Sequence, residues 1–160
     1  PLCWIAFGPL ATAAALIVIS PKSSLQTIPW KTSLMLGSGP AMATTLVLFC
    51  SHFHQINQDA AVGKKSPLVL LGTHRAAKVL PWLILLIFLL ELLPVINGIW
   101  PITTLICLIS LPSGIDLIKL IKRHHNQPEH IQNSKFLALR FQTINGISLS
   151  IGFAASYLFL

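Results

Sequence analysis

Long apolar segments separated by short polar stretches dominate the chain. A membrane-spanning helix needs about 20 mostly apolar residues, and several segments meet or approach this length. These segments are residues 2–20, 32–53, 79–96, 101–118 and 136–160. The pattern therefore predicts an all-α polytopic membrane protein with five transmembrane helices, in one domain that covers residues 1–160.

The composition supports a membrane protein and excludes two other classes. Hydrophobic residues make up 54% of the chain and charged residues only 9%, against about 25% charged in an ordinary soluble domain. So few polar residues could not cover a soluble core, and so many apolar ones exclude a disordered chain. The net charge of +7 could suggest a nucleic-acid partner. We expect none, because such a partner needs a polar surface, and we expect contact with a lipid bilayer instead.

Lysine and arginine concentrate in two connecting segments. The first follows the second predicted span and the second follows the fourth, and together they hold Lys64, Lys65, Arg75, Lys78, Lys119, Lys122, Arg123 and Lys135. Because two spans separate them, both segments should face the same side of the membrane. The positive-inside rule predicts that this side is the cytoplasm, or the stroma in a plastid.

The predicted loop 54–78 gathers the polar residues that could carry chemistry. If the second helix extends past His54, then Gln55 and Asp59 share a face, and Asn57 lies with them at the membrane mouth. An acid there could hold Mg²⁺, and Lys64 or Lys65 could hold phosphate. That combination suits a diphosphate whose tail lies in the bilayer. The alternative is a basic loop that fixes topology and touches anionic lipid, and composition alone favours this alternative.

Other ionisable groups offer weaker candidates. His52 and His54 are two residues apart and would point to different faces of a helix, so we expect no shared metal. One of them could contact a polar head group, or both could simply end the helix. Glu91 is about 18 Å from the start of its predicted span. An ionisable residue inside a span is a functional candidate by default, but Glu91 is far from the polar loop.

The loop resembles the second aspartate-rich motif of the UbiA superfamily of intramembrane prenyltransferases. The matching residues are Asp59, Gly63-Lys64, Ser66-Pro67 and Leu71-Gly72. A closer resemblance is to the MenA branch, the 1,4-dihydroxy-2-naphthoate phytyltransferases of cyanobacteria and chloroplasts. It rests on Ser51-His52-Phe53-His54-Gln55 followed by Gly63-Lys64-Lys65-Ser66-Pro67. The likeness extends over nearly the whole chain.

The resemblance implies a nine-helix bundle, of which this chain would be the C-terminal half with spans five to nine. The family's first motif, Asn-Asp-x-x-Asp-x-x-x-Asp, does not occur in these residues, and we expect it upstream of Pro1. The 160-residue chain alone should then lack transferase activity.

The resemblance also implies an enzyme that transfers a phytyl or polyprenyl group from its diphosphate to 1,4-dihydroxy-2-naphthoate. CO₂ and diphosphate would leave, in phylloquinone or menaquinone biosynthesis, in a cyanobacterial inner or thylakoid membrane or a plastid membrane. By the resemblance, Asp59 would bind Mg²⁺, and Lys64 and Lys65 would neutralise the leaving diphosphate. The head-group side of the substrate site would be lined by His52, His54, Gln55 and Asn57.

One departure and two alternatives remain open. Many family members carry an aspartate at the position of Gln55, so the local motif here has one carboxylate, Asp59. A relative with another aromatic acceptor, such as homogentisate or 4-hydroxybenzoate, would share these features. A non-catalytic membrane module, such as half of a transporter or an assembly factor, is the alternative from a different class.

Overall fold

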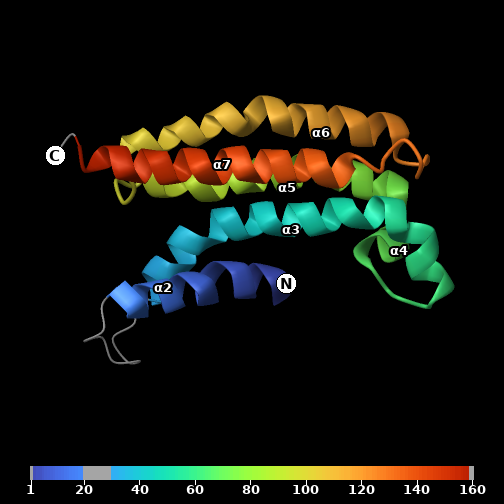
Figure 1. Cartoon of the computed structure of the whole chain (residues 1–160), viewed down its shortest axis with the longest axis horizontal. Coiled ribbons are helices and arrows are strands. Elements are labelled where there is room, and N and C mark those ends of the chain that lie inside the picture. The colour runs from blue at the N-terminus through green and yellow to red at the C-terminus, as the bar shows by residue number, and fades with distance from the viewer. Residues whose placement is uncertain (1, 20–29, 159–160) are drawn as a thin grey trace.

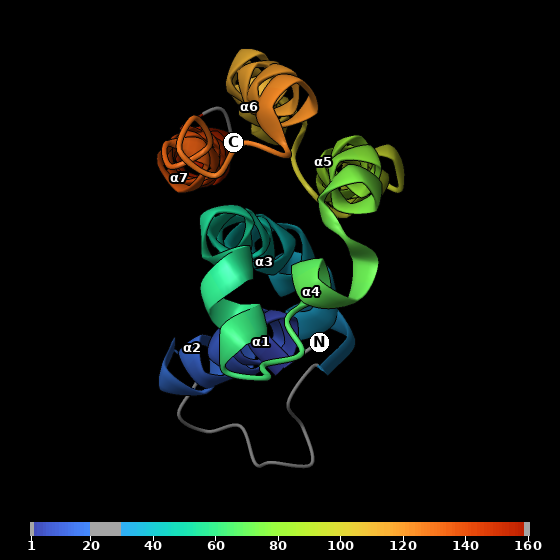
Figure 2. The ribbon, with the colours of Figure 1, turned by 90° about the vertical axis from the view of Figure 1, so that its right-hand side faces the viewer.

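The computed structural model describes residues 2–19 and 30–158 and contains no strand within them. Four long helical stretches lie side by side in a bundle (Figure 1), with the end view in Figure 2. They are α3 (Trp30–Ala61), α5 (Thr73–Ile96), the 3₁₀-helix η3 (Ile102–Ser110) continued by α6 (Leu111–His124), and α7 (Ser134–Ser156). This architecture confirms the predicted all-α class.

An N-terminal helical stretch packs against the first half of α3. It consists of α1 (Leu2–Ile5), the π-helix η1 (Ala6–Leu10) and α2 (Ala11–Ile19). The crossing is close because two glycines meet there: a Cβ added to Gly37 would lie 2.6 Å from the backbone of Gly8. Small side chains let membrane helices pack this tightly.

Four helical stretches are long and apolar enough to cross a membrane, namely Leu2–Ile19, Trp30–Ala61, Thr73–Ile96 and Ile102–His124. They correspond to the first four predicted spans. The fifth predicted span, residues 136–160, coincides largely with α7, but α7 is not among the four. It carries Lys135, Arg140, Gln142 and Asn145, which lower its hydropathy. A fifth crossing therefore stays a prediction.

The helix α3 continues well beyond the predicted span 32–53. Its 32 residues correspond to about 48 Å at 1.5 Å per residue, whereas the hydrocarbon core of a bilayer is about 30 Å thick. Because α3 ends at Ala61, the first eight residues of the predicted loop 54–78 are helical. The next long helix, α5, begins at Thr73. What remains between the two helices is a tight turn and the short helix α4 (Pro67–Leu71).

The core of the bundle lies between α3, α5, α6 and α7. Its largest fully buried side chains include Leu46, Phe53, Leu80, Ile87 and Phe141. Phe88 and Phe141 meet edge to face, with ring centroids 5.9 Å apart. Such interdigitated apolar packing fixes how the helices lie against each other, and so it fixes the positions of the polar residues at their ends.

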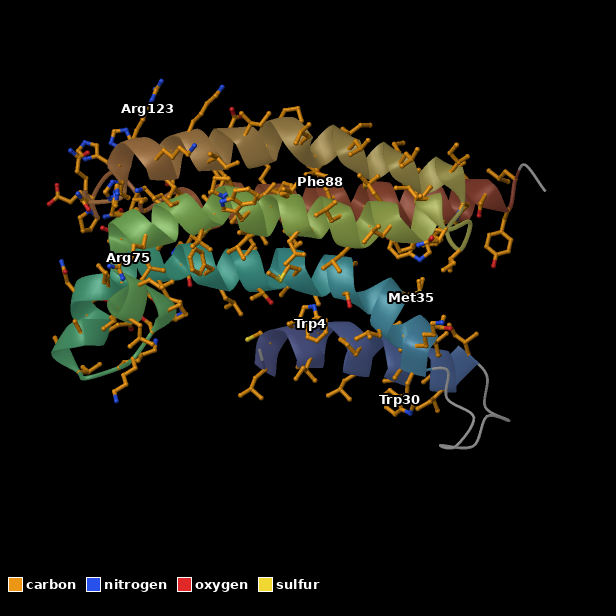
Figure 3. All side chains as sticks on the ribbon, turned by 180° about the vertical axis from the view of Figure 1, so that it is seen from behind. Trp4, Trp30, Met35, Arg75, Phe88 and Arg123 are labelled. Carbon is orange, nitrogen blue, oxygen red and sulfur yellow. The ribbon has the colours of Figure 1, made fainter. Side chains whose placement is uncertain are left out.

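Both basic connecting segments lie at the same end of the bundle, as their order in the chain predicted. Figure 3 shows Arg75 and Arg123 together at that end, opposite Trp30 and Met35.

The Thr73 hydroxyl donates a hydrogen bond to Asn126 Oδ1 at 2.6 Å, and the centroids of the His74 and His125 rings are 5.4 Å apart. These contacts tie the start of α5 to the segment between α6 and α7. We call this end the basic end.

Candidate active site at the basic end

A glycine turn at the end of α3 brings Lys64 back to Asp59. The N–H of Lys64 donates to the carbonyl oxygen of Asp59 at 2.8 Å, and the N–H of Gly63 donates to that of Ala60 at 3.1 Å. These two bonds, with Gly63 at a φ of +68°, form a Schellman motif, in which glycine is favoured because it lacks a Cβ. In the spacing Asp-x-x-x-Gly-Lys, the glycine turn that ends the helix thus places Lys64 next to Asp59.

The Asp59 carboxylate accepts hydrogen bonds from two side-chain nitrogens. Lys64 Nζ donates to Oδ1 and His52 Nδ1 donates to Oδ2, each at 3.0 Å. His52 lies seven residues before Asp59, two helical turns, and therefore shares its face of α3. The Asp59 side chain is only 9% exposed, whereas that of Lys64 is 53% exposed. The cluster therefore presents a fixed carboxylate behind a lysine that solvent and ligands can reach.

The neighbours of Asp59 favour its ionised form. The hydrogen bond from Lys64 lowers the pKa of the Asp59 carboxyl below its ordinary value, and hydrogen bonds with Ser66 and His52 act in the same direction against the effect of burial. Asp59 lies beyond the predicted span 32–53, on the part of α3 that exceeds the thickness of a bilayer core. It is therefore a carboxylate at neutral pH, available as an acceptor or as a metal ligand.

The short helix α4 packs against α3. Ser66 begins α4 as its N-cap, with its hydroxyl accepting a hydrogen bond from the N–H of Val69 at 3.4 Å, and Pro67 follows at the first helical position. A proline fits there because its missing N–H would have no helical partner. Ser66 and Leu68 are buried against the end of α3. The Ser-Pro pair of the motif therefore starts α4, which packs against α3.

The other predicted site residues do not join this cluster. Lys65 follows Lys64 but points into solvent, and Gln55 is half-buried; neither makes a side-chain hydrogen bond to another described residue. His54 and Asn57 lie on a different face of α3. Both line pockets whose second wall is the segment before α7 and the first turn of α7. His54 shares its pocket with Glu129 and Lys135, and Asn57 shares its pocket with Gln127 and His130.

The site at the basic end is therefore split between two faces of α3. Burial, Lys135 and His52 lower the pKa of His54, so its ring is neutral at physiological pH. The segment 127–136, which forms the second wall of these pockets, was not assigned a site role from its residues. Only the folded chain brings it next to α3, since it is about 70 residues away in sequence.

The donor set near Asp59 fits a magnesium ion only with a single protein ligand. No group of three or more His, Cys, Asp or Glu side chains within residues 2–19 and 30–158 is placed to hold a metal. Mg²⁺ commonly binds through one or two carboxylates together with water and phosphate oxygens. Asp59 can serve as one such carboxylate if Lys64 turns toward the phosphate.

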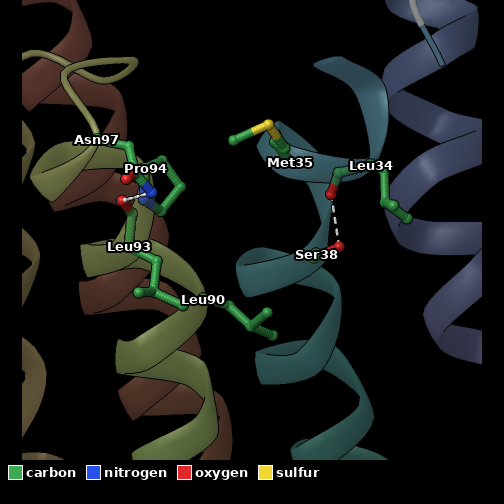
Figure 4. Close-up of a pocket in the computed structure, with 7 residues that line it drawn as sticks. All are labelled: Leu34, Met35, Ser38, Leu90, Leu93, Pro94 and Asn97. Atoms are coloured by element: carbon green, nitrogen blue, oxygen red, sulfur yellow. Dashed lines mark hydrogen bonds between the residues drawn. The ribbon is translucent and has the colours of Figure 1, made fainter. Parts of the chain in front are cut away.

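An apolar pocket lies far from this cluster, between the first half of α3 and the end of α5. Figure 4 shows its lining residues, Leu34, Met35, Ser38, Leu90, Leu93, Pro94 and Asn97. Ser38 is 21 positions before Asp59, or about 32 Å along the helix. The pocket is therefore separate from the Asp59 cluster.

Two curated proteins match nearly all of this chain. The chloroplastic 2-carboxy-1,4-naphthoquinone phytyltransferase of Arabidopsis thaliana is 38% identical over 154 residues, which are 95% of this chain and 40% of that protein. The 2-carboxy-1,4-naphthoquinone phytyltransferase of Synechocystis is 37% identical over 155 residues, 95% of this chain and 48% of that protein. The chain thus spans less than half the length of the curated relatives it matches. No family model and no solved structure matches it.

Proposed function

We propose that this chain, a homologue of MenA-type phytyltransferases of the UbiA superfamily, is part of an integral, multi-pass membrane prenyltransferase. The proposed reaction moves a phytyl or polyprenyl group from its diphosphate to 1,4-dihydroxy-2-naphthoate, with loss of CO₂ and diphosphate. This acceptor is the reduced form of the 2-carboxy-1,4-naphthoquinone in the relatives' names. The observation that carries the proposal is the Asp59–Lys64 pair at the basic end, held by the turn at Gly63.

The proposed role of the lysines is electrostatic. When the bond between the prenyl carbon C1 and the diphosphate oxygen breaks, both electrons leave with the diphosphate, and its negative charge grows. Lys64 Nζ is held 3.0 Å from Asp59 Oδ1 while the Lys64 side chain stays 53% exposed, so its ammonium can meet that charge without a large rearrangement. Lys65, which is exposed beside it, adds a second cation. Preorganised charges of this kind often make the largest single contribution to catalysis.

We assign Asp59 as a ligand of Mg²⁺, with His52 as the residue that orients its carboxylate. Bound Mg²⁺ would neutralise phosphate charge and so make the diphosphate a better leaving group. On the acceptor, the ring carbon that carries the carboxylate forms the new carbon–carbon bond with C1. The old bond to the carboxylate then breaks, its electrons return to the ring, and CO₂ leaves. His54, Gln55 and Asn57 are assigned to the polar head groups of the substrates.

The proposal includes a location. By the positive-inside rule, the basic end faces the cytoplasm, or the stroma in a plastid, of a cyanobacterial inner or thylakoid membrane or a plastid membrane. Apolar helices and a chloroplastic relative support this placement. The partners are then the lipid bilayer, the prenyl diphosphate and the naphthoate.

The test is a transfer assay on the full-length protein in nanodiscs. Phytyl diphosphate is offered with 1,4-dihydroxy-2-naphthoate, homogentisate or 4-hydroxybenzoate, and prenylated product and CO₂ are measured. We expect product with the naphthoate and CO₂ in equal amount. Transfer to another acceptor would keep the enzyme class and reject the naphthoate, whereas no product with any acceptor would favour a non-catalytic membrane module.

The assay is repeated with Asp59→Ala and Asp59→Asn. We expect both substitutions to abolish transfer, because the site loses its one local carboxylate, while the protein stays folded. Asp116→Asn is the matched control: Asp116 is exposed on α6, and its loss should leave turnover unchanged. Near-normal turnover of Asp59→Ala would reject the assignment of Asp59.

A further inference from the structure

A second acid lies in the interior of the bundle, away from the proposed site. Glu91, on α5, is 1% exposed, and Asn145, on α7, is also 1% exposed. Asn145 Nδ2 donates a hydrogen bond to Glu91 Oε2 at 2.9 Å. The sequence marks Glu91 as an ionisable residue inside a predicted span, and the structure gives it a specific partner.

The carboxyl also lies directly against the backbone of α3. A Cβ added to Gly39 would be 2.6 Å from Glu91 Cγ and 3.1 Å from its Oε1. The absence of a side chain at residue 39 thus creates the niche that receives Glu91. The carboxyl is enclosed by α3 on one side and by the residues around Asn145 on the other.

The hydrogen bonds of this cluster are incomplete in a specific way. The Asn145 amide nitrogen, with its two hydrogens, also lies 3.4 Å from Ser110 Oγ, and that hydroxyl donates to the carbonyl oxygen of Cys107. Among the described residues, Glu91 Oε1 and Asn145 Oδ1 have no hydrogen-bond partner, although both are buried. Both atoms are acceptors if Glu91 is ionised, and the Cys107 thiol beside Glu91 is only a weak donor, so the cluster lacks one strong donor.

A proton on Glu91 supplies that donor. An unpaired buried carboxylate in a membrane interior is costly, and the titratable group beside it is the Cys107 thiol, which carries no compensating positive charge. A carboxylic acid and a carboxamide can form a closed pair with two hydrogen bonds. One bond, Asn145 Nδ2–H to Glu91 Oε2, is present already, and the second would join Glu91 Oε1–H to Asn145 Oδ1, the two buried atoms without a described partner.

We propose that Glu91 is a neutral carboxylic acid that forms a two-bond pair with Asn145 and thereby locks α5 to α7 in the bundle interior. The pair is a structural device that sets how these two helices lie against each other. It is independent of the proposed transfer reaction, because neither residue reaches the basic end.

The decisive test is infrared spectroscopy of the full-length protein in nanodiscs at neutral pH, compared with Glu91→Gln. A glutamine preserves both hydrogen bonds, because its amide donates to Asn145 Oδ1 and accepts from Nδ2. We expect the difference spectrum to show a carboxylic-acid C=O stretch that the substitution removes. Loss of a carboxylate band instead would show that Glu91 is ionised and would overturn the proposal.

Thermal unfolding then tests the pairing. Glu91→Gln should leave the melting temperature nearly unchanged, whereas Glu91→Leu and Asn145→Leu should each lower it by roughly 2–12 °C, since each strands a buried polar group. In Glu91→Leu/Asn145→Leu the loss should be smaller than the sum of the single losses, because no group is left unpaired. Additive losses, or a Glu91→Gln variant as unstable as Glu91→Leu, would contradict the pair. If a leucine variant fails to fold, the infrared comparison still decides.

Discussion

Two adjacent lysines at the basic end differ in what they can do. Lys64 Nζ contacts Asp59, and its backbone N–H is fixed by the same residue. Lys65 is exposed, with no described side-chain partner. A charge held in place costs less to reorganise during a reaction than a free one, so the two residues should contribute unequally to the proposed transfer.

This inequality can be measured in the full-length protein with Lys64→Met and Lys65→Met. We expect Lys64→Met to lower kcat by roughly 10²–10³-fold, the usual cost of losing one preorganised group that stabilises developing charge. Lys65→Met should cost clearly less, and Lys64→Arg should retain much of the rate because it keeps the charge. A larger decrease in kcat for Lys65→Met than for Lys64→Met would show that the contact with Asp59 does not determine which lysine contributes more to the transfer.

The pairing of Asp59 with Lys64 was foreseeable from the sequence, since their spacing around a glycine suffices to join them. The sequence predicted different faces for His52 and His54, but not that Asp59 shares the face of His52, away from His54 and Asn57. Their faces depend on whether α3 continues past residue 53, and each added residue rotates the helix by about 100°. The partner of Glu91 was equally hidden, because Asn145 is 54 residues away and only the packing of α5 on α7 brings them together.

At the scale of the elements, the end of α3 controls the geometry of the proposed site. The left-handed backbone at Gly63 is what reverses the chain onto Asp59. A residue with a Cβ pays about 1–2 kcal/mol for this conformation, and asparagine is the most tolerant replacement.

We therefore expect Gly63→Ala to separate Lys64 from Asp59 and to lower transfer activity, with Gly63→Asn retaining most of it. The measurement is kcat for both variants, together with a double-mutant cycle with Lys64→Met. In the Lys64→Met background, Gly63→Ala should have little further effect, because the contact that it disturbs is already absent. Gly146→Ala serves as the control, since an added Cβ there meets no atom within 4 Å. Equal activity of Gly63→Ala and the unmodified protein would refute a positioning role for the turn.

Hydropathy located the first four apolar helices but not their ends. The last eight residues of α3 are largely polar, and they stay helical because the next residue that breaks the helix is Gly63. Hydropathy cannot register such a polar extension. The pattern also did not predict the 3₁₀ geometry of η3 or the π-helix at Pro9, because hydropathy does not distinguish these helices from an α-helix.

At the scale of the whole molecule, charge is gathered at one end of the bundle. The segments 62–72 and 125–133 lie together there, joined by Thr73 and Asn126, while Asn97 lies in the turn at the other end. This arrangement agrees with the topology that the basic residues predict. Which side of the membrane the basic end faces is a separate question for experiment.

That side can be established with single cysteines and a membrane-impermeant maleimide on sealed vesicles. Val62→Cys and Gln127→Cys, both at exposed positions, should be labelled from the cytoplasmic or stromal side, and Asn97→Cys from the opposite side. Of the thiols of this chain, Cys50 and Cys107 are buried, and Cys3 is replaced by serine. Labelling of positions 62 and 127 from different sides would refute the predicted topology.

The length of α3 has a consequence for the lipid around it. A helix about 18 Å longer than the hydrocarbon core must tilt or protrude, and Asp59 lies on the last turns of its polar end. In thicker bilayers, more of α3 is drawn into the acyl-chain region, and the Asp59 cluster moves closer to the lipid head groups. Hydrophobic mismatch thereby links the acyl-chain length of the membrane to the depth at which a diphosphate would have to bind.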